Sequence, residues 1–238
     1  MQSIVIFLGI ALVLSVILSN FLESSNKRKG EDFTFKEFIK EFKIKNIDIK
    51  YVFIFFILFE ILSKFIPFYD LIFYIPVVFA LILAFCLDLK YMIIPDTSSA
   101  DIFVSGIINL ISQISLQKTI NSIIGLILGG IVFYIINKIS EIFTKQTGFG
   151  FGDIKLLAAI GMFFGYKDII VIMIMSVFIS AAFSMVFLIV NKIRKIKEEY
   201  LPFGPFIVIS TLIICIIPGA KIIDMYIYLI DSLINKLI

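Results

Sequence analysis

The sequence predicts an all-α, polytopic helical membrane protein with about eight or nine membrane segments. Hydrophobic residues make up 61% of the 238 residues, and the mean hydropathy is +1.10. Soluble domains contain roughly 45–50% apolar residues. Long apolar runs recur along the chain, and several approach or exceed the roughly 17–25 residues that an α-helix needs to cross a bilayer. A soluble core cannot bury that much apolar surface, so lipid must surround most of this chain.

The first expected element is an N-terminal transmembrane anchor over residues 1–22. Its apolar run is followed by the basic stretch SSNKRKG, and no basic residue precedes it. A cleaved secretory signal carries its positive charge in front and ends in a small-residue cleavage site. The charge after the helix therefore predicts an uncleaved anchor whose N-terminus lies outside the cell.

Residues 23–50 form the most polar stretch of the chain and are expected to be cytoplasmic. Eight Lys and Arg residues fall between Lys27 and Lys50. Thr34 and Glu37 have the spacing of a helix capping box, and apolar residues follow at helical spacing: Phe35, Phe38, Ile39 and Phe42. This pattern fits a basic amphipathic helix on the inner leaflet. A short linker that packs on the membrane domain fits equally well.

Residues 51–238 are expected to form the polytopic catalytic membrane domain. Prolines mark several segment ends, where a missing amide donor is tolerated. The segment after the glycine-rich turn at 148–153 is short, which indicates a half-span or a tilted helix that packs closely on a neighbour. The expected segments are 51–66, 69–87, 101–116, 120–142, 154–165, 168–191, 203–218 and 222–238.

The distribution of basic residues orients these segments in the cell membrane. With the first helix running inwards, loops 88–100, 143–153 and 192–202 face the cytoplasm. Of the 21 Lys and Arg residues, all but four then lie at cytoplasmic ends. That asymmetry follows the positive-inside rule. The four outer residues are Lys64, Lys118, Lys167 and Lys221.

Several chemistries are excluded by composition. The chain has no histidine, which removes Ser-His and Cys-His pairs and HExxH-type zinc sites. Cys86 and Cys215 lie alone in apolar runs, without the CxxC spacing of a metal or redox site, and are expected to be packing residues. We expect no metal, no cofactor and no nucleic-acid partner. Acid–base chemistry falls to carboxylates, Lys or Tyr.

Two aspartates differ from the other carboxylates in context. Asp88 closes the apolar run FALILAFCLD, and Asp153 lies in the turn TGFGFGD that opens the short segment. Ionisable groups beside hydrocarbon are costly and are candidates for function. Because two spans, out and back, separate the pair, both aspartates return to one membrane face, where their side chains can meet.

The environments of these two carboxylates are expected to differ. The helix dipole should favour the ionised form of Asp153, and desolvation should favour the protonated form of Asp88. Such a pair can act as one base that activates water and one acid that polarises a peptide carbonyl. On spacing alone, a simpler interpretation stays open: each aspartate merely caps a helix end.

Three blocks of this sequence resemble those of one family. GFGDIKLLAAIGMFFG (150–165) closely resembles the GxGD block of type IV prepilin peptidases, the membrane aspartic proteases that process pilins and archaeal flagellins. LDLKYMIIPD (87–96) resembles that family's first-aspartate block, and LPFGPFIV (201–208) is similar to a block that opens a late helix. The blocks occur in the family's order and cover the chain from about residue 70 to 218.

The resemblance implies that Asp88 and Asp153 are the catalytic pair. It also implies that the partners are pilin-like or flagellin-like precursors with a short basic leader, a cleavage point usually after a small residue, and an apolar helix that stays in lipid. Asp96 and Glu141 are then candidates to attract the leader's charge. The supporting positions carried over are Gly150, Gly152, Lys155, Pro95, Asp96, Pro202, Gly204 and Pro205.

One region departs from the bacterial pattern. Many bacterial members carry a CxxC-containing cytoplasmic insert and methylate the new N-terminus with S-adenosylmethionine. Here residues 23–50 stand in that place, with no cysteine and no glycine-rich loop. We therefore expect a peptidase-only, archaeal-type enzyme without N-methyltransferase activity.

Two other functions use the same aspartates. An intramembrane GxGD protease of the presenilin type would cut within a substrate's span, and a transporter or channel would bind a cation or proton. Transporter sites usually lie near the bilayer midplane, whereas this pair is expected at one membrane edge. The LPFGPF block also speaks against the presenilin type.

Overall fold

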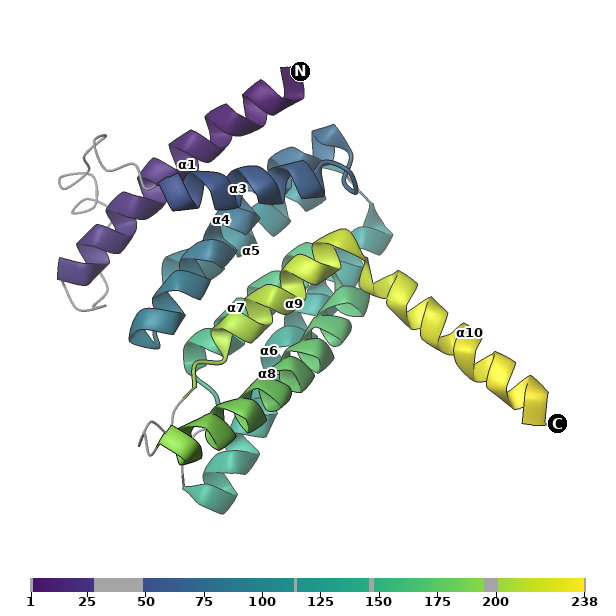
Figure 1. Ribbon diagram of the computed structural model, residues 1–238. Coiled ribbons are helices and arrows are strands. Elements are labelled where there is room, and N and C mark those ends of the chain that lie inside the picture. The colour runs from purple at the N-terminus through teal and green to yellow at the C-terminus, as the bar shows by residue number, and fades with distance from the viewer. Residues whose placement is uncertain (1, 28–48, 114, 146–147, 195–200, 238) are drawn as a thin grey trace.

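The structure is a computed structural model that describes residues 2–27, 49–113, 115–145, 148–194 and 201–237. Over these residues the chain forms nine helices and no strand (Figure 1), which confirms the all-α prediction. The helices are α1 (Gln2–Lys27), α3 (Ile49–Leu62), α4 (Phe68–Tyr91), α5 (Asp96–Ser112), α6 (Leu116–Thr144), α7 (Phe151–Phe164), α8 (Tyr166–Arg194), α9 (Gly204–Ile216) and α10 (Gly219–Leu237).

Within the part of the chain that the structure describes, four helices are long and apolar enough to cross a membrane. These are α1, through its segment Ile6–Glu23, and α4, α6 and α8. A fifth span arises only if α9 and α10 count together, although the chain bends by 80° between them. The protein is thus polytopic, with four to five candidate spans. The expected eight or nine segments also include shorter helices, such as the 14-residue α7.

Helix starts differ from expectation where the first turn is polar. The segment expected at 101–116 begins at Asp96, directly after Pro95. The short segment expected from 154 begins at Phe151, after Gly150. Acidic residues suit a first turn because of the helix dipole, and hydropathy alone misses such turns. The amphipathic helix expected within 23–50 falls largely outside the described residues.

The short helix α7 lies at the centre of the molecule. It packs against α5 and α6 and also touches α8 and α9. Leu156, Leu157 and Ile160 are fully buried. A Cβ atom on Gly125 of α6 would overlap the backbone of Gly161 in α7, so both glycines permit the close approach. A helix too short to span lipid is thereby enclosed by protein.

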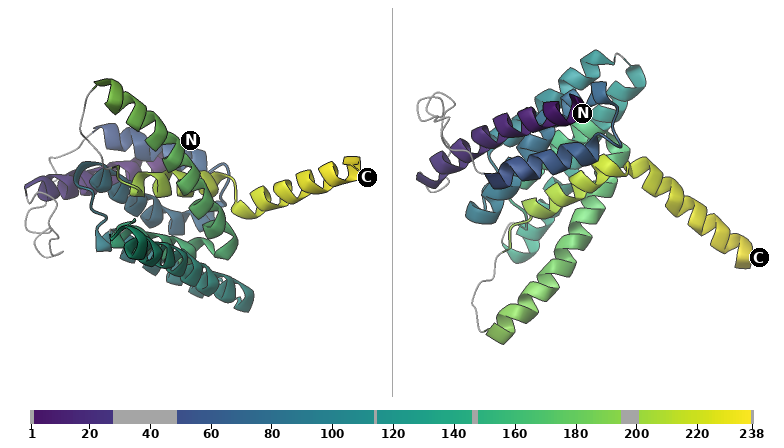
Figure 2. Two further views of the ribbon diagram at one scale, coloured as in Figure 1. Left: turned by 90° about the horizontal axis from the view of Figure 1, so that it is seen from below. Right: turned by 45° about the horizontal axis from the view of Figure 1, so that its top comes forward.

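A second group of helices covers the other side of α4. α1 packs on α3 and α4 (Figure 2). Phe7 of α1 stacks on Phe59 of α3 at 6.4 Å between ring centroids, and Phe55 lies against Phe79 of α4 at 6.1 Å. Aromatic contacts therefore join α1 to α3, and α3 to α4.

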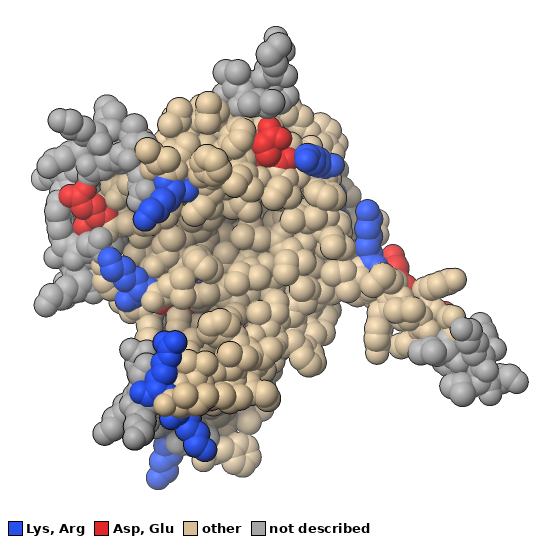
Figure 3. Space-filling model, viewed as in Figure 1, with Lys and Arg blue, Asp and Glu red and all other residues tan. Residues whose placement is uncertain are grey.

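The helices alternate in direction, so the bundle has two distinct ends. At one, the aspartate end, α4 and α6 finish and α5, α7 and α9 begin. At the other, the distal end, α5, α7 and α9 finish and α8 and α10 begin. Between the ends, the face drawn in Figure 3 is largely free of charged residues, with most of the visible Lys and Arg grouped at one side, and many large apolar side chains of the bundle are exposed. Such a surface suits contact with lipid.

Candidate active site

Asp88 lies in the last turn of α4. Its backbone carbonyl accepts a hydrogen bond of 2.9 Å from the N–H of Met92, whose left-handed φ of 55° ends the helix. Its side chain is 5% exposed. Oδ2 of this carboxylate accepts a hydrogen bond of 2.8 Å from the N–H of Gly204. Asp88 therefore does not cap its own helix; it holds the first turn of α9.

Gly204 is required at its position by this contact. A Cβ atom there would lie 2.5 Å from Oδ2 of Asp88 and 3.0 Å from Cδ1 of Ile94. The next residue, Pro205, has no N–H and fits the first turn of a helix. The LPFGPF block thus has a local purpose: it starts α9 and brings one amide against Asp88.

Asp153 lies in the first turn of α7. Its Oδ2 accepts a hydrogen bond of 3.0 Å from the N–H of Gly150, so this aspartate does cap its helix, as the simpler interpretation allowed. Its other oxygen, Oδ1, is buried and has no hydrogen-bond partner among the described residues. One carboxylate oxygen is therefore structural, and the other is available to a proton, a water or a substrate.

Ile94 joins the two aspartate blocks. A Cβ atom on Gly152 would lie 3.1 Å from Cβ of Ile94. Ile94 also packs against Gly204, which donates to Asp88. The side chain is therefore a buried spacer between the turn before α7 and the start of α9.

Burial sets the protonation of Asp153. Desolvation, with a smaller contribution from the charge of Asp88, raises the pKa of Asp153 to about 7, and the hydrogen bond from Gly150 lowers it less. The expected ionising effect of the helix dipole is therefore outweighed. The influence of Asp88 shows that the two carboxyl groups interact, so their titration is a property of the pair.

Asn137 was missed by the sequence analysis. This α6 residue clamps the turn before α7: its Nδ2 donates to the carbonyl of Phe149 at 3.0 Å, and its Oδ1 accepts from the N–H of Phe149 at 3.1 Å. The ring of Phe149 lies 4.8 Å from those of both Phe133 and Phe203. An amide in an apolar helix was the available signal.

Lys155 and Asp96, both expected supporting positions, form an ion pair. Nζ lies 2.7 and 2.8 Å from the two carboxylate oxygens. Glu141 likewise pairs with Lys138 at 2.8 Å. Both acids are already paired, which does not support their expected part in attracting a basic leader. The ion pair of Lys155 and Asp96 instead ties α7 to α5.

Two further expected positions flank the site. Pro95 directly precedes α5, and its carbonyl accepts a hydrogen bond of 3.0 Å from the N–H of Ser98. Pro202 is half-buried in the segment before α9. In the first turn of α5, the hydroxyls of Ser98 and Ser99 are buried without a hydrogen-bond partner among the described residues. The sequence analysis did not single out these two serines.

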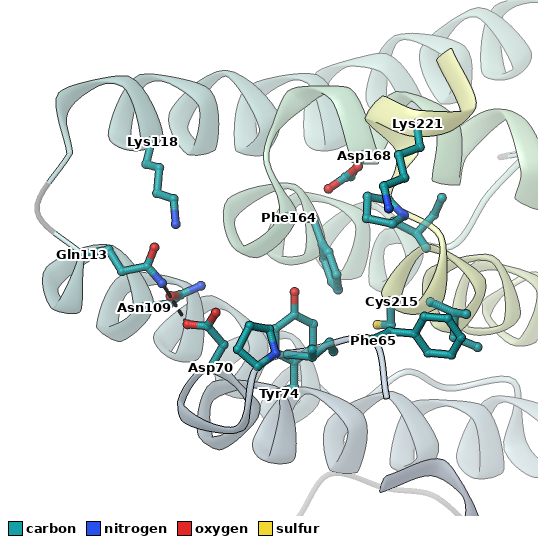
Figure 4. Close-up of a pocket in the computed structure, with 15 residues that line it drawn as sticks. Phe65, Asp70, Tyr74, Asn109, Gln113, Lys118, Phe164, Asp168, Cys215 and Lys221 are labelled. Carbon is teal, nitrogen blue, oxygen red and sulfur yellow. Dashed lines mark hydrogen bonds between the residues drawn. The ribbon is translucent and has the colours of Figure 1, made fainter. Parts of the chain in front are cut away.

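A polar cavity of about 250 Å³ lies at the distal end, away from the aspartate pair (Figure 4). Asp70, Asp168, Lys118 and Lys221 line it together with Gln113, whose Nε2 donates to Asp70 at 3.2 Å. Asp70 lies in the first turn of α4 and Asp168 in the first turn of α8, where Asp168 also accepts a hydrogen bond from Gly219.

The described residues contain no group of three or more Cys, Asp and Glu side chains that could hold a metal ion. Cys215 is buried, Cys86 is half-buried, and neither forms a disulfide. Both lie in the packed groups of apolar residues, as expected.

Comparison with known proteins connects this geometry to a family. Residues 75–189 match the type IV leader peptidase family. The chain is 26% identical over 125 residues to a prepilin leader peptidase/N-methyltransferase of Aeromonas salmonicida, covering 52% of this chain and 42% of that protein. A protein of the same name from Legionella pneumophila is 28% identical over 160 residues, covering 66% of this chain and 54% of that one.

Leader peptidase HopD of Escherichia coli is 30% identical over 130 residues, which cover 53% of this chain and 80% of HopD. The chain thus spans less than half of the Aeromonas protein but most of HopD. No solved structure matches this chain. These relatives are bacterial, so they give no support to the expected archaeal type. The family match contains both aspartate blocks, and the chain belongs to the type IV leader peptidase family.

Proposed function

We propose that this protein is an aspartic endopeptidase that removes the short basic leader from type IV pilin-like precursors at the cytoplasmic face of the cell membrane. The observation that carries the proposal is the pair of buried aspartates from different helices, each held through one oxygen by a backbone amide: Asp88 by Gly204 and Asp153 by Gly150. Helix capping alone does not explain why two interacting carboxyl groups are buried at the same end of the bundle.

The proposed chemistry divides the two roles by environment. Asp88 lies at the N-terminus of α9, whose dipole favours a negative charge, and serves as the base that takes a proton from the attacking water. Asp153, whose raised pKa favours the protonated form, donates a hydrogen bond from its carboxyl group to the scissile carbonyl. After attack, Asp88 holds the proton that the departing amine needs.

The site's position suits a precursor with a charged leader and an apolar helix. The aspartates lie where α4 ends and α7 begins, at the edge of the bundle's apolar surface. A substrate helix can stay in lipid while its leader stays in water. The positive-inside asymmetry of the sequence supports a cytoplasmic position for this edge. We further propose a peptidase without methyltransferase activity, because residues 23–50 contain no cysteine.

The test is cleavage of a precursor with a short basic leader, a small residue at the cut and an apolar helix, using the full chain in lipid vesicles. Asp88→Asn and Asp153→Asn should each lower cleavage by at least about 1,000-fold, because each removes one half of the acid–base pair. Asp224→Asn, an exposed carboxylate of α10, is the matched control and should cleave normally.

Mapping the cut by mass spectrometry separates the alternatives. A cut between leader and apolar helix supports the proposal, and a cut inside the helix favours an intramembrane protease. Near wild-type turnover in either active-site variant contradicts the assignment of the pair. Ion flux without any cleavage favours a transporter.

A further inference from the structure

α10 leaves the bundle at a sharp, well-defined angle. The chain bends by 80° between α9 and α10, and α10 projects sideways from the distal end in the views of Figures 1 and 2. Within the described residues, its main contact is with α8. α9 packs along α4 and α8, which are candidate spans. A helix at 80° to α9 therefore lies close to the plane of the membrane.

The bend is held by a specific contact. Oδ1 of Asp168, in the first turn of α8, accepts a hydrogen bond of 2.6 Å from the N–H of Gly219. The N–H of Ala220 also bonds to this carboxylate. A Cβ atom on Gly219 would lie 2.8 Å from Oδ1 of Asp168 and 3.1 Å from Val171. Asp168 thus caps the start of α10, and only glycine fits beside it.

The sequence of α10 has two distinct faces. Lys221, Asp224, Asp231 and Asn235 recur at spacings of three, seven and four residues, so they share one helical face. Apolar residues fill the opposite side, and their exposed members include Tyr226 (64%), Leu229 (51%) and Ile230 (37%). Figure 3 shows a basic and an acidic group side by side at the base of this helix.

A helix with one apolar and one charged face, lying parallel to a bilayer, fits the boundary between headgroups and acyl chains. Tyr226 adds a ring with a polar tip, a type enriched at membrane interfaces. In a spanning helix, a charged stripe along the length would place ionised side chains in hydrocarbon, which is energetically costly.

We propose that α10 is an interfacial helix that lies in the phospholipid leaflet at the distal end, with its apolar face in the acyl region and its charged face in water. Asp168 fixes its direction at the bend. This role does not depend on the proposed peptidase activity.

The chain contains no tryptophan, so single-tryptophan variants report their own depth without background. Y226W, I230W and L237W place an indole along the apolar face, and D231W places one on the charged face. The full chain is reconstituted in vesicles of phosphatidylcholine and phosphatidylglycerol whose acyl chains are brominated either near the headgroup or near the methyl end.

An interfacial α10 gives all three apolar-face variants similar, strong quenching by the shallow bromines, at a depth of roughly 5–10 Å. D231W is quenched at least severalfold less. Quenching that shifts steadily from shallow to deep bromines between Y226W and L237W would show a spanning helix and overturn the proposal. So would an apolar face that neither set of bromines quenches, which is the result expected if a second copy of the chain covers it.

The role of Asp168 is tested in the I230W background. Asp168→Ala removes the cap, and the indole should then spread over a wider range of depths, with weaker shallow quenching. Asp70→Ala is the matched control, because this distal carboxylate bonds to Gln113 and not to α10. Unchanged quenching in the Asp168 variant would overturn the assigned hinge, while the single-tryptophan series tests the helix position by itself.

Discussion

At the scale of single residues, the candidate site depends on backbone amides more than on side chains. Asp88 is oriented by the N–H of Gly204 and Asp153 by the N–H of Gly150. A hydrogen bond from the main chain is fixed by helix position and has no rotamer freedom to lose. The sequence blocks that contain Gly204 and Gly150 therefore position backbone N–H donors beside the aspartates. Glycine suits both positions because a Cβ atom would come close to the carboxylate oxygen that accepts the bond.

Gly204→Ala tests this placement. The new methyl group would meet Oδ2 of Asp88 at 2.5 Å, so the carboxylate must move. Displacing a catalytic group by about 1 Å can lower a rate roughly 100-fold, and we expect a fall in kcat of about that size in the precursor assay. Gly130→Ala, where the nearest atom is Cβ of Ala158 at 3.5 Å, is the control. Equal activity of the two variants would contradict the close contact.

Asn137→Ala tests the clamp on the turn before α7. Two hydrogen bonds to Phe149 are lost, each contributing about 0.5–1.5 kcal/mol, so the turn should open more often. We expect reduced cleavage and faster amide hydrogen exchange across residues 148–152. Asn121→Ala, on the same helix near the distal cavity, should leave both measurements unchanged. Faster exchange in both variants would indicate a general loosening of α6.

The sequence predicted the aspartates and their glycines but not the residues that support them. Asp88 and Asp153 are noticeable because a carboxylate beside an apolar run is costly. Ile94 is one apolar residue among many, and nothing in its spacing indicates that it separates two blocks. In the sequence, Ser98 and Ser99 resemble the polar residues that are common in the first turn of a helix. These serines are buried because α5 packs on α4 and α7. A local sequence pattern does not predict that packing.

At the scale of helices, the contact between α6 and α7 determines where Asp153 lies. The two backbones touch at Gly125 and Gly161 and again where Gly129 meets Leu157. Small residues at a helix interface allow this approach in lipid, where hydrophobic association contributes little. α7 is thereby held in the interior although it is too short to span.

Adjacent glycines of α6 give a matched test of this interface. A Cβ atom on Gly129 would overlap the backbone of Leu157, whereas one on Gly130 makes an ordinary contact of 3.5 Å. Gly129→Ala should lower the thermal midpoint in detergent and reduce cleavage. Gly130→Ala should be neutral or stabilising, since alanine is favoured over glycine in a helix by about 1 kcal/mol. The reverse order would show that α6 and α7 do not pack as described.

Most helices could be predicted from hydropathy, and their ends could not. The expected segment 203–218 is close to α9, and 69–87 lies within α4. The segment expected at 222–238 is helical up to Leu237, but its direction depends on the contact between Asp168 and Gly219, which are 51 residues apart. Contacts between residues so far apart in the sequence cannot be predicted from local composition.

At the scale of the whole molecule, the buried Asp153 lowers stability at high pH. Its pKa is raised to about 7 in the folded protein, against about 3.9 in an unfolded chain. Between these values the folded protein binds more protons than the unfolded chain, so stability falls as pH rises through this interval.

Asp153→Asn should therefore raise the thermal midpoint in detergent at about pH 9 and leave it close to wild type at about pH 4. Asparagine is neutral at every pH, and its amide oxygen can still accept the bond from Gly150. Scanning fluorimetry of both proteins across this range measures the difference. A gain that is equal at both pH values would mean that charge burial is not the cause.

The hydrogen bond between Asp88 and Gly204 joins residues 116 positions apart. Membrane helices enter the bilayer in order as the ribosome extends the chain, so all of α5 to α8 must be made between α4 and α9. Until then Asp88 lacks the amide that orients it. A nascent or truncated chain that ends before α9 therefore holds both aspartates without the amide of Gly204, and the proposed site is complete only after the first turn of α9 has been inserted.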